Sequence, residues 1–483
     1  MKEAINNASV VMAAPSGDPF ADVGAAVLRK LLAQNPNWKP KDALKHATDV
    51  YVHGWHSKLH AFFLNSGITN PANKGKEIER TLEYYEPMLE EAAACIKGWC
   101  RVSGQYEALF PAGRENQILA GSGTFLNFNH GLEQGLRLGG NTLLQMYFAP
   151  LGCIEVGGNP ALVHSSQPTI TALLAAKNLT ANLRPAGAEL KPGLAKSSRS
   201  NAANTLFGYV DDILLEVKKA GHLELKGPAP ALTLYNFTNF GAKPDVVLHH
   251  LSAAVFEFYQ QVMSAFKEPW TWFVRAHYRN SKFKGARARP DTTALLVLGK
   301  PNEAPAVVEP AVYQAWYNEV YQNLIKGYSL IHLIEQWSRK NYLPFELTAF
   351  YCQLLRHMDL KTLDLIAHVA RHIVAEADDS AINKTIRRIS TTRAASEMRL
   401  ILVGLQRRNY ETNQDAPEPL LRLEDYVRYL FPDGTSWREI RDLLLISLYE
   451  QLHLSNRHVE LEEGLEEVGV GTDETDEFET DQE

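Results

Sequence analysis

The sequence has few cysteines, and none stands in a metal-binding or disulfide-forming pattern. Its 483 residues include four cysteines, and no two of them have CxxC spacing. Short paired spacings are typical of zinc sites, and dense, regular cysteines are typical of disulfide-stapled secreted domains. We therefore interpret Cys95, Cys100, Cys153 and Cys352 as reduced cysteines of a cytoplasmic protein.

Long apolar runs are also missing. No stretch reaches the roughly 18 to 20 apolar residues that a membrane-spanning helix needs. The opening MKEAINNASVVMAAP has one lysine, an early glutamate and only a brief apolar patch. We therefore expect neither a secretory signal nor a membrane partner.

No familiar catalytic motif is complete. GSG at 121–123 lacks the third glycine of GxGxxG, and neither GxxxxGK[ST] nor GxSxG occurs. The histidines of 53-HGWHSKLH-60 lack the glutamate of the zinc motif HExxH. We expect no catalytic residue, no metal and no cofactor.

Two aspartates open the first apolar run, in 17-GDPFADVG-24. Asp18 and Asp22 stand four residues apart, so they could share one face of a helix, and metal nucleases use converging carboxylates. No partner carboxylate follows with nuclease spacing. The GDPF context favours a turn in which Asp18 accepts hydrogen bonds ahead of Pro19, so we predict a helix entry rather than a metal site.

The net charge of −7 hides an uneven distribution. Residues 460–483 hold twelve acids and no Lys or Arg, and without them 49 Lys and Arg face 44 Asp and Glu. We predict a disordered acidic tail over residues 458–483. Such a tail can mimic nucleic acid or can simply aid solubility. The rest of the chain is mildly basic.

Hydrophobic periodicity predicts an α+β protein with an all-helical end. We predict a mixed body with short strands and many helices over residues 1–308, and an all-α helical bundle over residues 309–457. Within the body, we expect helices over 17–65, 75–100, 202–221 and 244–266, and strands over 143–166, 231–240 and 293–299. No fixed-period repeat occurs, so the pattern excludes a solenoid.

The densest basic stretch is 275-RAHYRNSKFKGARAR-289. It contains no acid and six cations: Arg275, Arg279, Lys282, Lys284, Arg287 and Arg289. Cations this close repel one another unless an anion neutralises them, and a nucleic-acid backbone does so with release of counterions. Its aromatic residues His277, Tyr278 and Phe283, with Trp270 and Trp272 just before it, could stack on unpaired bases. The alternative is a solvated surface loop.

A second basic candidate is the polar loop 182-NLRPAGAELKPGLAKSSRSN-201. We expect its cations Lys191, Lys196 and Arg199 to contact phosphates, and an ordinary disordered loop is the alternative. A third run, 384-KTIRRISTTRAASEMRLILVGLQRR-408, has seven basic residues against Glu397. On a helical wheel Lys384, Arg387 and Arg388 share one side, while Ile382, Ile386 and Ile389 point to a core. We expect this basic side to follow a nucleic-acid backbone, and a solvated helix face is the alternative.

Two motifs give a resemblance to a known family. GDPFADVGAAVL (17–28) resembles the signature GxPFVDxGxxAL, which opens the large-subunit family of type I-B CRISPR Cascade, the Cas-eight proteins. TFLNFNHGLEQGLRLGGNTLLQMYFAPLG (124–152) is similar to that family's TFxNFF…GLxLCGxCLLALQxLPLG. Many relatives carry cysteines where this chain has Gly139, Gly140 and Asn141, so the family's structural zinc is not carried over.

The resemblance implies a non-catalytic role in RNA-guided DNA recognition in a prokaryotic cytoplasm. Implied partners are the CRISPR guide RNA, the target duplex and its displaced strand, the Cas-five, Cas-seven, Cas-six and small Cas-eleven subunits, and either the helicase-nuclease Cas-three or a transposition adaptor. The large subunit would read the protospacer-adjacent motif and open the duplex. The helical end resembles the small subunit, which an internal start at Met358 would release as a separate product.

The residues that read the adjacent motif would be short polar groups beside phosphate anchors. Two stretches offer them, with these candidates: Asn127, Asn129, Gln134, Arg137, Ser198, Asn201 and Asn204. For the displaced strand we favour residues 275–289 and the basic face from Lys384 to Arg393. The alternatives are a stand-alone nucleic-acid-binding or helical adaptor protein and a metal-dependent nuclease.

Overall fold

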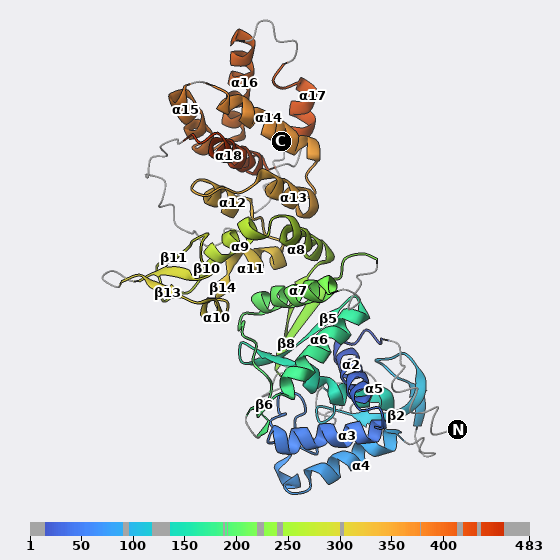
Figure 1. Cartoon of the computed structure of the whole chain (residues 1–483). Helices are drawn as coiled ribbons and strands as arrows, with labels where there is room; N and C mark the ends of the chain where they lie inside the picture. The colour runs from blue at the N-terminus through green and yellow to red at the C-terminus, as the bar shows by residue number, and fades with distance from the viewer. Residues whose placement is uncertain are drawn as a thin grey trace. The chain divides into compact units, whose positions relative to one another are not determined.

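The computed structural model describes most of the chain (Figure 1). The described residues are 15–89, 96–117, 136–186, 189–190, 192–219, 227–238, 245–299, 304–376, 378–412, 419–431 and 436–457. The chain divides into two compact units, Met1–Leu330 and Ile331–Glu483. The acidic tail at 458–483 lies outside the described residues.

The first unit mixes helices with short strands. Its helices are α2 (Pro19–Gln34), α3 (Pro40–Asp49), η1 (Val50–Gly54), η2 (Pro71–Asn73), α4 (Glu77–Leu89), α5 (Gly140–Phe148), η4 (Ala149–Gly152), α6 (Pro168–Asn182), α7 (Ala202–Lys218), α8 (Ala253–Ala265), α9 (Lys267–Ala276), α10 (Pro310–Tyr313) and α11 (Glu319–Lys326). Its strands are β1 (Ile96–Trp99), β2 (Tyr106–Ala112), β3 (Leu136–Gly139), β4 (Ile154–Val156), β5 (Asn159–Ser165), β6 (Pro185–Ala186), β7 (Glu189–Leu190), β8 (Leu232–Thr238), β9 (Asp245–Leu251), β10 (Tyr278–Arg279), β11 (Gly285–Ala288), β12 (Leu295–Leu298), β13 (Ala306–Val308) and β14 (Tyr317–Asn318).

Helix α2 begins where the sequence predicts a helix entry. The Asp18 carboxylate caps it by accepting hydrogen bonds from Phe20 N–H at 3.0 Å and Ala21 N–H at 2.8 Å, and Pro19 occupies the first turn. Gly17 before it has φ of +82°, which glycine adopts without strain. The structural role that we predicted for Asp18 is confirmed.

The core of the first unit surrounds α2. This helix contacts α5, α6, η4 and β5, and nearly all its residues up to Leu28 are buried. Phe20 packs edge-on against Phe237 of β8, with ring centroids 5.1 Å apart. A four-stranded antiparallel sheet in the order β4-β5-β8-β9 lies beside these helices.

Four local predictions were wrong in this unit. Residues 55–65 lie in turns and irregular structure rather than in a helix. Residues 143–152 form α5 and η4 rather than strands, because a largely apolar run fits a buried helix as well as a buried strand. Residues 245–251 form β9 rather than the start of a helix, and Ser252 caps α8 after it. Residues 96–99 form β1 rather than the end of a helix.

The second unit is helical throughout its described residues. Its helices are α12 (Ile331–Ser338), α13 (Phe345–Leu355), α14 (Leu360–Val374), α15 (Asp379–Ser390), α16 (Ala395–Thr412), α17 (Leu423–Asp425), η5 (Tyr426–Leu430) and α18 (Trp437–Leu454). Helix α18 contacts α12, α13, α14, α15 and α16, so it forms the centre of this unit. The expected fold class, an α+β body followed by an all-helical end, is confirmed.

The first unit extends beyond residue 308, where we expected the body to end. Strand β14 pairs with β10, and helix α11 contacts α7 and β9, so residues up to Leu330 belong to the first unit. Within the described residues, no helix is long and apolar enough to cross a membrane.

Candidate nucleic-acid interface

The densest basic stretch contributes strand β11 to a small three-stranded antiparallel sheet, and we call residues 278–298 the basic ribbon. Strands β11, β12 and β13 pair in that order, and Arg287 lies opposite Leu296. The neighbouring Ala286 and Ala288 lie opposite Val297 and Leu295, which are fully buried. Because side chains alternate along a strand, Arg287 lies on the outward face of the ribbon.

Five of the six predicted cations of this stretch are exposed. They are Arg279, Lys282, Lys284, Arg287 and Arg289. Within the described residues, none of the five forms an ion pair with a carboxylate. Their charges are therefore uncompensated inside this part of the protein, which is the condition for strong attraction to phosphates.

Arg275, the sixth cation, faces inward. Its guanidinium donates hydrogen bonds to the carbonyl oxygens of Arg289, at 2.5 Å, and of Thr292. Burial lowers the pKa of this guanidinium. Arg275 therefore fixes the turn between β11 and β12, and we leave it out of the interface.

Most of the aromatic residues that we expected to stack on bases are in the core. Trp270, His277 and Tyr278 are each more than nine-tenths buried, so this prediction is wrong for them. They alternate with cations in the sequence because helix α9 and strand β10 present one side to the core. Phe283 stays half-buried beside Trp316, with ring centroids 5.5 Å apart, and both line a cavity of about 230 Å³. Sequence reasoning missed Trp316.

The loop before α7 is held by internal contacts. Lys196 pairs with Glu155 at 3.1 Å, and Arg199 pairs with Asp211 at 3.5 Å. Ser197 N–H donates to the Glu155 carbonyl at 2.9 Å. These contacts hold the described residues 196–199 in place, and Lys196 and Arg199 already have carboxylate partners. Lys191 lies outside the described residues.

Two of the motif-reading candidates are structural. Asn204 is fully buried, and its amide donates to the carbonyls of Gln314 and Trp316, so its prediction as a base reader is wrong. Asn201 caps α7 by accepting from the N–H groups of Ala203 and Asn204.

Of the other motif-reading candidates, two are exposed in the structure and three lie outside the described residues. Ser198 and Arg137 are exposed, in the loop before α7 and on β3. Asn127, Asn129 and Gln134 lie outside the described residues.

The third basic run behaves as its pattern predicts. Ile382, Ile386 and Ile389 of α15 are buried. The cations of this face, Lys384, Arg387, Arg388 and Arg393, are all exposed. They lie in the second unit, so the chain carries a basic surface on each of its units.

The structure brings two predicted sites together. Arg199 of the second loop and Arg275 of the basic stretch line one cavity of about 350 Å³, with Asp211 and Tyr259. Tyr259 Oη donates to Asp211 Oδ1 at 2.8 Å. Burial raises the pKa of Asp211.

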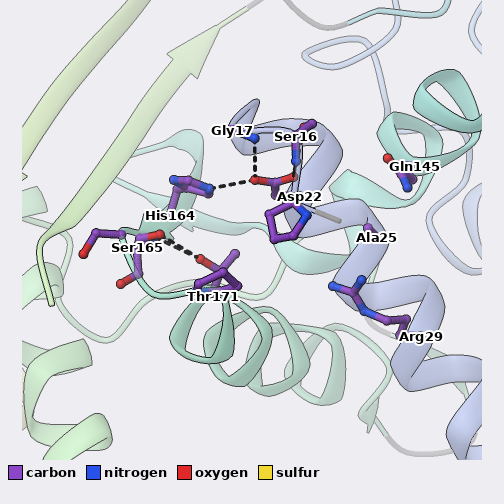
Figure 2. Close-up of a pocket in the computed structure, with 12 residues that line it drawn as sticks. Ser16, Gly17, Asp22, Ala25, Arg29, Gln145, His164, Ser165 and Thr171 are labelled. Carbon is purple, nitrogen blue, oxygen red and sulfur yellow. Dashed lines mark hydrogen bonds and ion pairs between the residues drawn. The ribbon is translucent and has the colours of Figure 1, made fainter. Parts of the chain in front are cut away.

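A separate pocket contains a histidine–aspartate pair that sequence reasoning missed (Figure 2). His164 Nε2 of β5 lies 3.0 Å from Asp22 Oδ2 of α2, 142 residues away in sequence. Ser16 N–H and Oγ–H donate to Asp22 Oδ1 at 2.7 and 2.9 Å, and Gly17 N–H donates to Oδ2 at 3.1 Å. Asp22 thus ties the start of the described chain to the central sheet.

The surroundings of the two aspartates shift their pKa values in opposite directions. Burial raises the pKa of Asp18 more than its backbone hydrogen bonds lower it. Burial also acts to raise the pKa of Asp22, but the hydrogen bonds from His164 and Ser16 outweigh it and lower that pKa. Asp22 therefore stabilises the fold as a carboxylate.

We expect Asp22→Asn to lower the free energy of unfolding at pH 7 by about 1 to 2 kcal/mol, because it weakens four hydrogen bonds to one buried group. A carboxyl group whose pKa is lowered by folding stabilises the folded state at pH values above its ordinary pKa of 3.8. This stabilisation is lost as the pH falls through the lower pKa of the folded state. The difference between wild type and variant should therefore shrink below about pH 4. Urea unfolding at a series of pH values measures it.

The control for this prediction is another histidine–aspartate pair. Asp49 and His53 lie 3.7 Å apart on the surface, with both side chains about two-thirds exposed. Asp49→Asn should change stability by less than about 0.5 kcal/mol. Equal effects of the two substitutions would show that Asp22 is not a structural tie.

Among the described residues, no three His, Cys, Asp or Glu side chains gather in a way that could hold a metal ion. No protein-family model matches the chain, and no curated protein matches it.

Proposed function

We propose that this chain is the non-catalytic large subunit of a type I-B CRISPR RNA-guided surveillance complex, or Cascade. In this role it recognises the protospacer-adjacent motif in duplex DNA, helps to open the duplex and stabilises the displaced strand. It then recruits a downstream effector, either the helicase-nuclease Cas-three or a transposition adaptor.

The observation that carries the proposal is the packing of the two resembling motifs against each other. The first motif forms the entry and first turns of α2, and the end of the second forms α5 and η4. An added Cβ at Gly24 would lie 1.7 Å from the Gln145 carbonyl oxygen, and one at Gly152 would lie 2.5 Å from Val23 Cγ1. Glycines of both motifs thus permit one close helix crossing. This packing supports the view that the two motifs, about a hundred residues apart, belong to one family signature.

The exposed cations support the nucleic-acid part of the proposal. Phosphate contacts hold a protein in register on DNA without reading sequence, and guide–target pairing supplies sequence in RNA-guided systems. The basic ribbon and the α15 face would hold the displaced strand. Arg137 and Ser198 remain the described candidates for motif reading, because both are exposed.

The decisive experiment is a tagged pull-down of the full chain from its native host, with mass spectrometry of partners and sequencing of bound RNA. We expect short RNAs of uniform length that share a repeat-derived 5′ handle, together with Cas-five-, Cas-seven- and Cas-six-like proteins. Mixed RNA or none, without such partners, would support the stand-alone binder instead. Cleavage of DNA by the purified chain with Mg²⁺ or Mn²⁺ would support the nuclease alternative.

An internal start at Met358 would remove part of the second unit. Such a product would lack α12 and α13, both of which contact α18. It would also lose the hydrogen bond from Phe345 N–H to Glu450 Oε1, which is 2.7 Å long. A free small subunit made in this way must cover that side of α18 with another protein of the complex. Absence of a C-terminal fragment from native preparations would remove the internal start from the proposal.

A further inference from the structure

The pocket beside Asp22 is a polar cavity within the first unit, away from the basic ribbon. It has a volume of about 350 Å³, and α2, α5, β5 and the start of α6 contribute to its lining (Figure 2). This volume lies at the small end of the range for small-molecule sites. Three of its lining side chains carry the argument: Asp22, Arg29 and Gln145.

The Arg29 guanidinium favours an anion in this pocket. Asp22 is more than nine-tenths buried, and its carboxylate is already engaged by His164, Ser16 and Gly17. Arg29 is half-buried, and it has no ion-pair partner among the described residues. An unpaired guanidinium in a partly desolvated cavity attracts carboxylates and phosphates, whose oxygens match its planar donors.

Gln145 offers a second polar group to a ligand in this pocket. Its side chain lines the cavity and is more than nine-tenths buried. Among the described residues, its amide has no hydrogen-bond partner. Among the described residues, its amide is therefore available to a molecule that binds in the cavity. The Asp22 contact holds His164 at the wall of the same cavity, and Nδ1 of that ring has no partner within the described chain.

We infer that this pocket binds a small molecule with an oxyanion, a phosphate ester or a carboxylate, through the Arg29 guanidinium and the Gln145 amide. The inference does not depend on the proposed function, since the cavity is separate from the basic ribbon. The oxyanion neutralises Arg29 and accepts a hydrogen bond from the Gln145 side chain.

The test is titration calorimetry of the full chain with inorganic phosphate, ribose 5-phosphate and acetate at constant ionic strength. We expect saturable binding of at least one probe, and the class that binds identifies the oxyanion. Arg29→Gln should weaken that binding at least tenfold. The adjacent Lys30→Gln, which changes an exposed cation outside the pocket, should alter it by less than twofold. Absence of saturable binding, or equal affinities of the two variants, would overturn the inference.

Two further variants distinguish anion binding in this pocket from a purely structural role of Gln145 and from anion binding on the basic ribbon. Gln145→Leu keeps the side-chain volume and removes the amide, so we expect weaker binding with an unchanged or higher melting temperature. A lower melting temperature with unchanged binding would make Gln145 structural and contradict its assignment. The double variant Arg287→Gln, Arg289→Gln should keep full binding, and loss of binding in it would place the anion on the basic ribbon instead.

Discussion

Replacing Gly24 by alanine is expected to lower the free energy of unfolding of the first unit by more than about 3 kcal/mol. The added Cβ would lie 1.7 Å from the Gln145 carbonyl oxygen and 3.0 Å from the Ala149 backbone nitrogen. Both neighbours are backbone atoms of α5 and η4, so no side chain can turn away to relieve the contact. Helices α2 and α5 must move apart instead, which opens the core between them.

An opposing effect is too small to cancel this loss. Alanine is favoured over glycine in a helix by about 1 kcal/mol. Gly404 of α16 is a matched control, because it lies inside a helix and an added Cβ there would meet no atom within 4 Å. Urea unfolding should show Gly404→Ala unchanged or slightly stabilised and Gly24→Ala strongly destabilised. Equal stability of the two variants would mean that the α2–α5 crossing is looser than described.

The double charge reversal Arg287→Glu, Arg289→Glu is expected to weaken binding to single-stranded DNA by about 25-fold or more near 0.1 M salt. Each phosphate contact on a single strand changes the affinity by about fivefold between 0.1 and 1 M salt, and two contacts multiply to about 25-fold. The salt dependence should fall as well, by about one unit of slope for each contact. Fluorescence anisotropy across a salt series measures both quantities.

The matched control reverses two exposed cations elsewhere in the first unit. Lys74 and Lys76 lie between η2 and α4, outside every predicted interface. Their double reversal should leave the salt slope nearly unchanged. Preference among adjacent-motif sequences should survive the ribbon reversal, because phosphate contacts carry no base information. Unchanged affinity of the Arg287, Arg289 variant at low salt would remove the ribbon from the interface.

The parts of the structure that the sequence predicts are those with a local cause. Asp18 caps α2 because an aspartate before a proline and an apolar run is a helix entry. The three isoleucines of α15 are buried because their spacing matches one helix face. Helix α7 and strand β8 also lie where their periodicity indicates.

The parts that the sequence does not predict depend on contacts distant in sequence. Asp22 and His164 meet only because β5 lies against α2, and no spacing indicates that meeting. One signal was present: a carboxylate on the buried side of an apolar helix needs a partner. The prediction that aromatic residues near the basic ribbon stack on bases was wrong for a related reason. Neighbours in sequence can face opposite sides of a strand or helix, so these residues enter the core while the cations stay exposed.

The central place of α18 has a consequence for how the protein is made. Helices α12 to α16 all contact this helix, yet it is synthesised about a hundred residues after α12 begins. At translation rates of about 5 to 20 residues per second, that delay lasts roughly 5 to 20 s. Throughout it, the apolar sides of the earlier helices have no final partner. The earlier helices of this unit therefore need protection, for example by a chaperone, until α18 has been made.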